Sequence, residues 1–461
     1  MTKGDLMKIL MTGATGLIGK KLGLALVKQG HELTIISRDK VRAKHELPFP
    51  CEVLAADLNQ APVEIKNPFD IVINLLGESV ADGRWTKSRK DSILNSRVIG
   101  TRNLISMLKY PPKMIISANA IGYYGDRGDE LLNETSTPGA DFLSEVCINW
   151  QKEHERAQEK FGNKTKLASL RVGLVLSRNG GALTKMLFPF RVGLGGPLAS
   201  GRQYMSWIHL DDLVQMFCFI IEKQLSGIFN AVAPNPVTNL EFSKTLARTL
   251  SRPLGFAVPR FVLKLGLGEV ANAILESQKV SSEKIRKLGF EFRFDHIEAA
   301  FIDLLTSLRS SSEIYEFEQF VPQRKDKIFE FFSQAKNLEC LTPKNLKFHI
   351  KNMSTPAICL GTLIDYRLKI RGIPVGWQTL IDEWNPDSHF VDIQLKGPYK
   401  IWHHRHEFID LPGGTLVCDR VQFKLPAGFL GWLLAGFFVR ADVQKIFAFR
   451  RKAIFEMFCE G

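Results

Sequence analysis

Cysteine is scarce in this sequence, and its few copies follow no pairing pattern. Seven cysteines are spread singly along 461 residues, with no Cys-x-x-Cys motif among them. An odd number of isolated cysteines argues against a disulfide framework, and the missing motif argues against a structural zinc site. We therefore expect free thiols and a cytoplasmic protein.

Long hydrophobic runs are also absent. The first ten residues, MTKGDLMKIL, lack the apolar stretch of a signal peptide. The longest apolar run, GFLGWLLAGFFV at 428–439, is shorter than the ~20 residues that a membrane-spanning helix needs. We expect neither secretion nor a membrane span.

Long blocks of one charge sign are missing as well. The formal net charge is +13, but the 61 lysines and arginines are interspersed with 48 acidic residues. Nucleic-acid-binding proteins usually gather their basic residues into a patch or stripe, so we predict no nucleic-acid partner. The 45% hydrophobic content of so long a chain allows two or three cores, and at least two domains are expected. No feature of the sequence specifies an oligomeric state.

A glycine-rich stretch stands near the N-terminus. The stretch MKILMTGATGLIGKKL (7–22) runs from an apolar strand-like segment through Gly13, Gly16 and Gly19 into a helical pattern. Glycines at this spacing allow a tight turn, a close approach of a pyrophosphate to the backbone, and packing of the helix against the strand. The helix N-terminus then offers N–H donors to the phosphates.

The end of the next strand indicates which dinucleotide is bound. ELTIIS is followed by Arg38 and Lys40, where the adenosine ribose of the cofactor should lie. An arginine there can pair with a 2′-phosphate, which favours NADP, although Asp39 leaves NAD open as the less favoured alternative.

Further strand ends complete the predicted site. CEVLAADL brings Asp57 and Leu58 near the adenine, and FDIVINLLGES brings Leu75 to Gly77 to another strand end. Alternating strands and helices indicate a parallel, doubly wound sheet with ligands at the carboxyl ends of its strands. The predicted cofactor-binding residues are Gly13, Ala14, Thr15, Gly16, Leu17, Ile18, Gly19, Ser37, Arg38, Lys40, Asp57, Leu58, Leu75, Leu76, Gly77, Arg97 and Ser117.

Residues 7 to about 240 resemble an extended short-chain dehydrogenase/reductase of the epimerase type, as in SGRQYMSWIHLDDL (200–213). NLLGES, RWTKSRKDSILNSR and SANAIGYYG are similar to an atypical branch usually named only as epimerase family protein and sometimes labelled a cell-division inhibitor. Residues 252–300 resemble the short C-terminal domain of that branch. The resemblance implies a Rossmann domain over 1–245 and a small substrate lobe over 246–308.

The catalytic pair of ordinary members of this superfamily is missing. They use a tyrosine and a lysine four residues later, yet none of the seven tyrosines here has a lysine at that distance. If chemistry survives, Tyr123 or Tyr124 is the candidate acid, Ser117 would polarise a carbonyl, and Glu78 would act as base. Alternatively, both tyrosines only pack the loop over the cofactor.

The second half of the chain changes character after RSSSE (309–313), which reads as a linker. A strand, an amphipathic helix, several antiparallel strands and a long final helix over 314–461 resemble the START-like (SRPBCC) helix-grip superfamily. In that superfamily a curved sheet wraps a helix around an apolar cavity. LTP, GPYKIWHHRHEF and DRVQF are similar to the branch often fused to the atypical epimerase type. We expect an α/β Rossmann unit with a small lobe, followed by an α+β unit.

Strand alternation in WHHRHEF places four side chains on one face. These are Trp402, His404, His406 and Phe408, which we predict to line a cavity for an apolar ligand with a polar head. The alternative is that the histidines are hydrogen-bonded within a packed core. Because spacing fixes no third ligand, we predict no metal.

Two functions follow from these patterns. The first is an NADP-binding, epimerase-like oxidoreductase acting on an unknown carbonyl, sugar-like or lipid-like small molecule. The alternative is a non-catalytic NADP-dependent sensor, related to cell division or the cell envelope, which the missing Tyr-x-x-x-Lys pair favours.

Overall fold

A computed structural model describes residues 6–60, 64–309 and 312–459. The chain divides into two compact units, the first comprising 1–40 and 51–306 and the second 41–50 and 307–461. Within the predicted linker 309–313, residues 310 and 311 lie outside the described residues, and a strand already begins at Ser312. All seven cysteines are thiols, and the cytoplasmic location stays a prediction.

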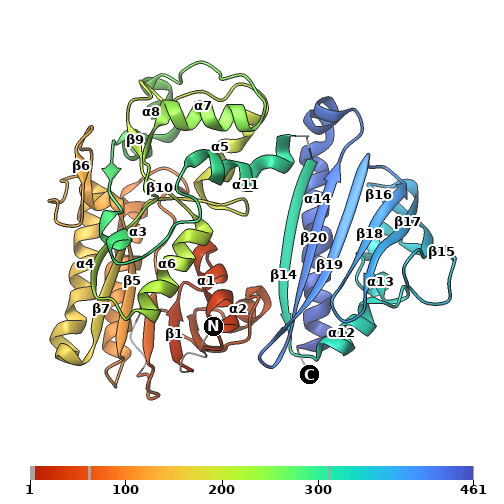
Figure 1. Cartoon of the computed structure of the whole chain (residues 1–461), viewed down its shortest axis with the longest axis horizontal. Helices are drawn as coiled ribbons and strands as arrows, with labels where there is room; N and C mark the ends of the chain where they lie inside the picture. The colour runs from red at the N-terminus through yellow and green to blue at the C-terminus, as the bar shows by residue number, and fades with distance from the viewer. Residues whose placement is uncertain (1–5, 61–63, 310–311, 460–461) are drawn as a thin grey trace. The chain divides into compact units, whose positions relative to one another are not determined.

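The first unit is built on a seven-stranded sheet in the order β11-β7-β5-β4-β1-β2-β3 (Figure 1). All neighbouring strands are parallel. The strands are β1 (Lys8–Thr12), β2 (Glu32–Ser37), β3 (Glu52–Ala55), β4 (Ile71–Asn74), β5 (Met114–Ala120), β7 (Lys166–Val172) and β11 (Gly227–Ala231). The chain progresses in one direction from β1 and in the other from β4, which confirms the predicted doubly wound parallel sheet and places its switch point between these two strands.

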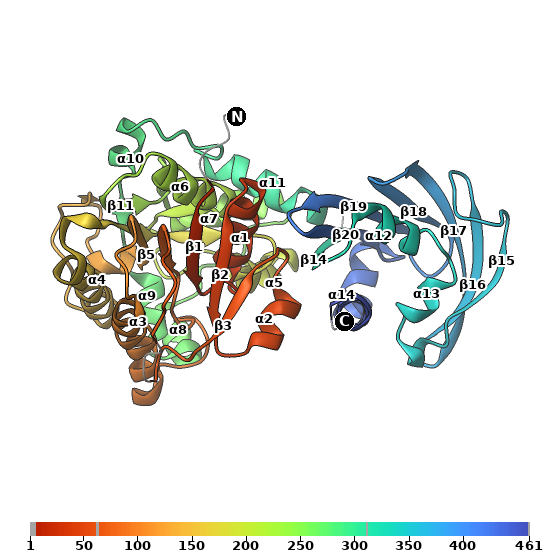
Figure 2. The same ribbon diagram turned by 90° about the horizontal axis from the view of Figure 1, so that it is seen from below.

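Helices cover both faces of this sheet. Figure 2 shows the sheet between the pair α3 and α4 and the pair α1 and α6, and the members of each pair pack together. The larger helices of this unit are α1 (Leu17–Lys28), α3 (Lys87–Met107), α4 (Phe142–Phe161), α5 (Gly181–Arg191), α6 (Leu210–Glu222), α7 (Asn239–Thr249), α8 (Arg260–Leu267) and α11 (Ile297–Arg309). Nearly all of α2 (Lys40–Glu46) belongs to the segment 41–50 that groups with the second unit.

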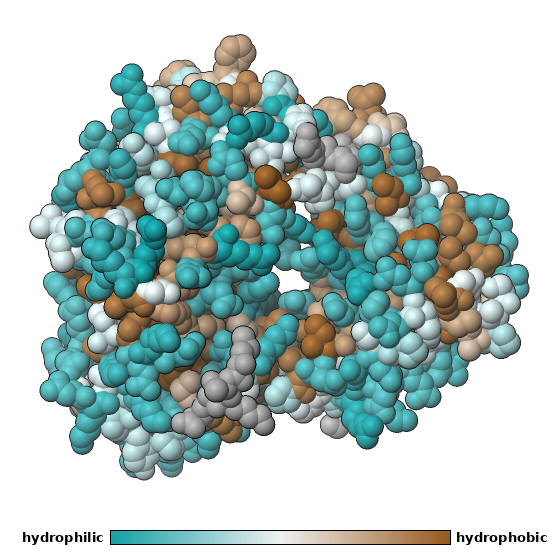
Figure 3. Space-filling view, in the orientation of Figure 1, coloured by the Kyte–Doolittle hydropathy of each residue, from teal (hydrophilic) through white to brown (hydrophobic). Residues whose placement is uncertain are grey.

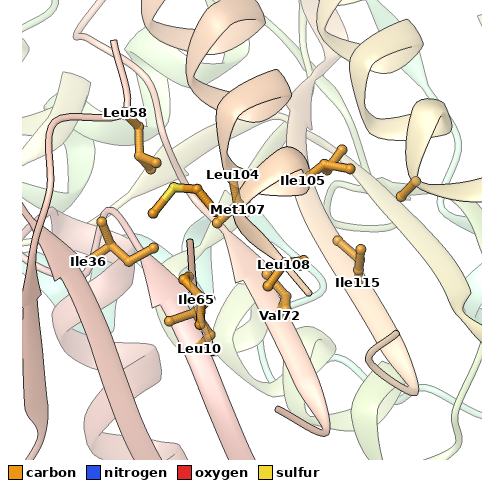
Figure 4. Close-up of a cluster of buried hydrophobic side chains, with 11 residues drawn as sticks. Leu10, Ile36, Leu58, Ile65, Val72, Leu104, Ile105, Met107, Leu108 and Ile115 are labelled. Atoms are coloured by element: carbon orange, nitrogen blue, oxygen red, sulfur yellow. The ribbon is translucent and has the colours of Figure 1, made fainter. Parts of the chain in front are cut away.

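Burial on both faces explains the continuous apolar runs of the central strands. Leu10 of β1, Val72 of β4 and Ile115 of β5 are at most 1% exposed and pack against Leu104 and Met107 of α3 (Figure 4). This cluster holds the strands whose carboxyl ends form the predicted site.

Short elements attach the small lobe to the sheet. The lobe contains α9 (Val270–Leu275), α10 (Glu283–Lys287) and β13 (Lys279–Val280), and β13 pairs with β6 (Leu131–Leu132). Two further small pairs join β8 (Leu174–Leu176) to β10 (Trp207–His209) and β9 (Tyr204–Met205) to β12 (Val237–Thr238). Residues far apart in the sequence thereby pair with one another.

The second unit is a seven-stranded antiparallel sheet in the order β14-β20-β19-β18-β17-β16-β15. Its strands are β14 (Ser312–Val321), β15 (His349–Met353), β16 (Leu363–Ile370), β17 (Ile373–Asn385), β18 (His389–Lys396), β19 (Ile401–Leu411) and β20 (Gly414–Lys424). The helices are α12 (Lys325–Phe332), α13 (Asn337–Cys340) and α14 (Gly428–Phe458). The antiparallel sheet and the long last helix were expected, whereas membership of the START-like class stays a prediction.

The helix α14 lies along this sheet (Figure 2), and aromatic side chains form part of the contact. Phe447 of α14 stacks on Phe317 of β14 with ring centroids 4.1 Å apart, and it shares a buried cluster with Val421 and Phe423 of β20. Although α14 includes the apolar run 428–439, no helix among the described residues has the length and hydropathy needed to cross a membrane. In the face drawn in Figure 3, hydrophilic residues predominate and hydrophobic ones form small groups.

Candidate functional site

Two close backbone approaches shape the glycine loop after β1. Gly13 has a left-handed φ of +68°, and a Cβ there would lie 2.4 Å from the carbonyl oxygen of Leu75. A Cβ on Gly19 would lie 2.3 Å from the carbonyl oxygen of Gly13. Gly13 therefore lets the chain turn beside the end of β4, and Gly19 lets α1 begin directly against the loop.

Gly16 faces away from the protein. It is exposed, and among the described residues an added Cβ would meet only the carbonyl oxygen of Gly13, at 3.2 Å. The outer side of the loop therefore offers bare backbone next to the first N–H groups of α1, and no acidic side chain lies in that first turn. Such N–H groups have no partner inside the helix, so the loop fits a pyrophosphate by shape and by charge.

The other loop residues line this turn. Ala14 is buried, whereas Thr15 and Ile18 are half-buried. Leu17 is also half-buried, and a Cβ on Gly181 would lie 3.4 Å from it, so the first turns of α1 and α5 lie close together.

A buried polar network that the sequence reasoning missed fixes the ends of β1 and β4. The Thr12 hydroxyl donates to Asn74 Oδ1 at 2.9 Å, and Asn74 Nδ2 donates to the Thr101 hydroxyl at 2.8 Å. The Trp150 indole on α4 donates to the same hydroxyl at 3.0 Å. Thr12 and Asn74 are register partners that end two adjacent apolar strands. A polar residue at the end of each of two apolar strands is the sequence signal that could have indicated this network.

The predicted adenosine end lies where β2 ends. Ser37 is half-buried, and its hydroxyl donates to the carbonyl oxygen of Asp39 at 3.1 Å, which holds the turn. Arg38 and Lys40 are exposed and accessible to an anionic ligand.

Asp57 and Leu58, predicted beside the adenine, have different surroundings. Asp57 is half-buried and accepts the N–H of Asn59 at 3.0 Å. Leu58 is only 6% exposed and belongs to the core cluster of Figure 4. Its side chain supports the sheet rather than offering a surface to a ligand.

Arg97, predicted as a cofactor contact, lies instead under the turn that follows β4. Its guanidinium donates to the carbonyl oxygens of Glu78 and Ile93, both at 3.0 Å, and a Cβ on Gly77 would lie 2.8 Å from it. Burial lowers the pKa of Arg97. The Glu78 carboxylate forms an ion pair with Arg89 at 2.5 Å. Both predicted groups are thus engaged in shaping this turn.

The two candidate tyrosines differ in accessibility. Tyr124 has no exposed surface, and its hydroxyl donates to Asn230 Oδ1 at 2.7 Å and accepts from Arg171 at 2.9 Å. Burial raises the pKa of Tyr124. Tyr123 is half-buried, with the Arg171 guanidinium 3.5 Å from its ring centroid. Within the described part of the chain, the Tyr123 hydroxyl makes no hydrogen bond.

Ser117 is only 1% exposed, and its side chain is hydrogen-bonded to a histidine of α4. Its hydroxyl lies 2.8 Å from His154 Nδ1. Burial lowers the pKa of His154 to about 4, so the ring is neutral at pH 7. Ser117 therefore serves the contact between β5 and α4, and its hydroxyl is engaged by His154.

The face of α4 that meets this edge of the sheet carries neither tyrosine nor lysine. Asn119 Nδ2 donates to the carbonyl oxygen of Cys147 at 3.1 Å and to Gln151 Oε1 at 3.4 Å, and the Ser169 hydroxyl donates to the same Gln151 oxygen at 2.7 Å. Burial raises the pKa of Cys147 to about 12. Cys147 and Gln151, four residues apart, are uncharged at neutral pH.

Glu276 is a perturbed acid that the sequence reasoning missed. It is half-buried in the loop after α9, whose next residue, Ser277, bonds to Asp126 through its N–H at 3.0 Å. Burial, together with the negative charges of Asp141 and Asp126, raises the pKa of Glu276 to about 8. No local signal identifies it, because its neighbours come from segments about 130 residues or more away.

The second unit encloses a cavity of about 730 Å³. Its wall is mostly apolar. Three of the four predicted side chains line it, namely Trp402, His404 and His406. Phe408 does not line it. Instead, Phe408 is 3% exposed and packs against Phe329 in the core cluster that also contains Phe332 and Phe390.

Two carboxylates flank the cavity histidines, one on each neighbouring strand. Asp392 of β18 is the register partner of His404, and Asp419 of β20 is the register partner of His406. Although burial opposes it, the histidines lower the pKa of Asp392 below its ordinary value. Burial likewise opposes the lowering at Asp419, where Arg450 and both histidines outweigh it. These cross-strand partners could not be found from spacing along one strand.

Comparison with known proteins gives the first unit clear relatives. The profile of the NAD dependent epimerase/dehydratase family matches residues 9–231, and that of a domain of unknown function, DUF1731, matches 258–304. The chain is 37% identical to the Epimerase family protein YfhF of Bacillus subtilis over 309 residues, covering 66% of this chain and 100% of that one. It is 36% identical to the chloroplastic Epimerase family protein SDR39U1 homolog of Arabidopsis thaliana, covering 65% of this chain and 86% of the relative.

A solved structure supports the same relationship. The human epimerase family protein SDR39U1 (isoform 2), crystallised with NADPH, superposes with a TM-score of 0.58 at 31% identity, covering 65% of this chain and 99% of that one. Both profile matches end before residue 305 and therefore concern the first unit.

Proposed function

Because this chain belongs to the NAD-dependent epimerase/dehydratase family, we propose that its first unit binds NADP and works as an epimerase-like oxidoreductase. The substrate would be a small carbonyl, sugar-like or lipid-like molecule. The observation that carries the proposal is the glycine loop at the switch point between β1 and β4, where Gly16 leaves bare backbone facing outward.

Residues of this chain would hold the cofactor in a defined way. The N–H groups at the start of α1 would bind the pyrophosphate, and Arg38 with Lys40 would bind the 2′-phosphate that distinguishes NADP from NAD. NADPH in the structure of the human relative supports this choice. When bound, the nicotinamide supplies hydride-transfer chemistry.

For the proton that accompanies hydride transfer, we assign Tyr123 rather than Tyr124. Tyr123 is half-buried and its hydroxyl is not engaged within the described residues, whereas the Tyr124 hydroxyl is enclosed by Asn230 and Arg171. A general acid must reach the atom that it protonates. Tyr123→Phe should therefore lower turnover at least tenfold, and Tyr124→Phe should act mainly on stability.

The experiment for the cofactor is a fluorescence titration with NADPH and NADH. Wild type should prefer NADPH, and Arg38→Asp should weaken NADPH binding at least tenfold while changing NADH binding little. Lys28→Asp is the matched control, because Lys28 is an exposed cation at the opposite end of α1. Equal affinity for both nucleotides in wild type would contradict the proposed NADP specificity, and no binding of either would contradict the site.

A second candidate function is a non-catalytic NADP sensor. The neutral face of α4, with Cys147 and Gln151 in place of an acid and a base, favours it. A screen of NADPH consumption with aldehydes, ketones and nucleotide sugars distinguishes the oxidoreductase from the sensor. Turnover that Tyr123→Phe abolishes supports the enzyme, whereas tight NADPH binding without consumption of any of them supports the sensor.

For the second unit we propose a START-like domain that takes up an apolar small molecule. A long helix packed on a seven-stranded antiparallel sheet and a mostly apolar cavity of about 730 Å³ support this function, since binding pockets for small molecules usually span ~300–1,000 Å³. Displacement of a fluorescent fatty acid probe tests it. Ala435→Trp, on the cavity wall, should abolish probe uptake, while Leu434→Trp, on the exposed side of α14, should not.

A further inference from the structure

We propose that Asp392, His404 and His406 bind a divalent transition-metal ion at the wall of the cavity in the second unit. The three side chains are at most partly exposed and come from the neighbouring strands β18 and β19. One ligand atom from each lies within 4.8 Å of the others. The proposal rests on the positions of these three side chains, and it does not require the cavity to take up an apolar molecule.

The spacing of the ligand atoms suits such an ion. Asp392 Oδ2 lies 3.3 Å from His404 Nδ1 and 3.1 Å from His406 Nε2. An ion bonded at ~2.1 Å to two ligands at octahedral or tetrahedral angles holds those ligands about 3.0–3.4 Å apart. Both distances fall in that interval, and the third pair of ligand atoms, on His404 and His406, lies within 4.8 Å.

The opposite side of the histidines is arranged as an outer shell. Asp419 Oδ1 lies 3.1 Å from His404 Nε2 and 2.7 Å from His406 Nδ1, and Arg450 lies 3.7 Å from the same oxygen. Metal-binding histidines usually donate their second ring N–H to a carboxylate, which fixes the tautomer and the ring orientation. Asp392, His404 and His406 border the cavity, whereas Asp419 lies behind them.

A purely ionic cluster accounts less well for these contacts. All four ring nitrogens of the two histidines face carboxylate oxygens. A neutral imidazole carries a single N–H, so without an ion one nitrogen of each neutral ring would face a carboxylate oxygen with no proton between them. An ion leaves each ring neutral, with one nitrogen bonded to the ion and the other donating to Asp419.

The ligand set defines the class of ion. Two imidazoles, which are borderline ligands, together with one hard carboxylate are typical of Zn²⁺, Co²⁺ or Fe²⁺, and three protein ligands leave coordination positions open. Those positions face the cavity, so the ion is placed to coordinate a polar group of a molecule held there.

The test is a titration of the chelator-treated full-length chain with Co²⁺, followed by visible absorption and by displacement with Zn²⁺. We expect one equivalent of Co²⁺ bound and full displacement by Zn²⁺. Asp392→Asn and His406→Gln should each weaken Zn²⁺ binding at least 100-fold, and Asp419→Asn by 10- to 100-fold. His403→Gln is the matched control, because alternation along β19 puts His403 on the other face.

Several outcomes would overturn the proposal. These are substoichiometric Co²⁺ uptake by wild type, unchanged affinity in the folded Asp392→Asn and His406→Gln variants, or loss of binding in His403→Gln. X-ray absorption of the zinc-loaded wild type keeps the test independent of variant folding. A shell of nitrogen and oxygen with two imidazoles is expected, and a sulfur ligand would contradict the site.

Discussion

Protonation of a single residue, His154, should make the free energy of unfolding depend on pH. Its pKa of about 4 in the folded chain lies below the 6.5 of an ordinary histidine, so the unfolded chain binds the proton more readily between these values. The stability that the neutral ring contributes is complete above pH 6.5 and is lost as the pH falls toward 4. At ~1.4 kcal/mol per pH unit, the loss amounts to about 3 kcal/mol.

Urea unfolding at pH 7.5 and pH 4.5 measures this contribution. His154→Gln, which can still accept a hydrogen bond from Ser117, should narrow the stability difference between the two pH values, whereas the exposed His296→Gln should leave it unchanged. An unaltered difference in His154→Gln would show that other groups carry the acid sensitivity.

Glu276 should produce the opposite trend. Its pKa of about 8 exceeds the ordinary 4.5, so the folded chain keeps a proton that the unfolded chain releases between these values, and stability falls as the pH rises through that window. Glu276→Gln should raise the melting temperature by at least ~2 °C at pH 8.5 and have little effect at pH 5. The exposed Glu291→Gln is the control. A similar gain at both pH values would point to packing rather than charge.

At the scale of elements, two glycines of the loop after β1 should have different roles, one in folding and the other in ligand binding. Gly13→Ala places a Cβ 2.4 Å from the Leu75 carbonyl at a positive φ, and it should cost about 2–4 kcal/mol of unfolding free energy. Gly16→Ala meets only the Gly13 carbonyl oxygen, at 3.2 Å and without a positive φ, and should leave stability within about 1 kcal/mol while weakening NADPH binding at least tenfold. Urea unfolding and the NADPH titration test both. Equal destabilisation by the two substitutions would contradict the assignment of Gly16 to the ligand.

Helices and strands that are indicated by neighbouring residues in the sequence could be predicted. Sites that combine residues from several elements could not. The strand, loop and helix over 8–28 follow from neighbouring residues, as does the alternation along β19. The burial of Arg97 under Gly77 depends on α3 crossing the end of β4. Likewise, the pairing of Asp392 with His404 depends on the register of two strands. Such contacts are set by packing between segments, which periodicity within one segment does not encode.

At the scale of the whole molecule, the two units have separate cores and should respond to separate ligands. The change of sequence character near residue 309 anticipated this division, but not the grouping of 41–50 with the second unit. A ligand that binds only the folded form of one unit stabilises that unit by about 2.7 kcal/mol at 100 times its dissociation constant.

Calorimetry of the full chain should therefore show two unfolding transitions. NADPH should raise one of them, Zn²⁺ should raise the other, and Asp392→Asn should remove the zinc response without changing the NADPH response. One cooperative transition raised by both ligands would instead mean that the units unfold together. In that case NADPH would protect the second unit against thermal unfolding and Zn²⁺ would protect the first, because each ligand would stabilise a folded form that both units share.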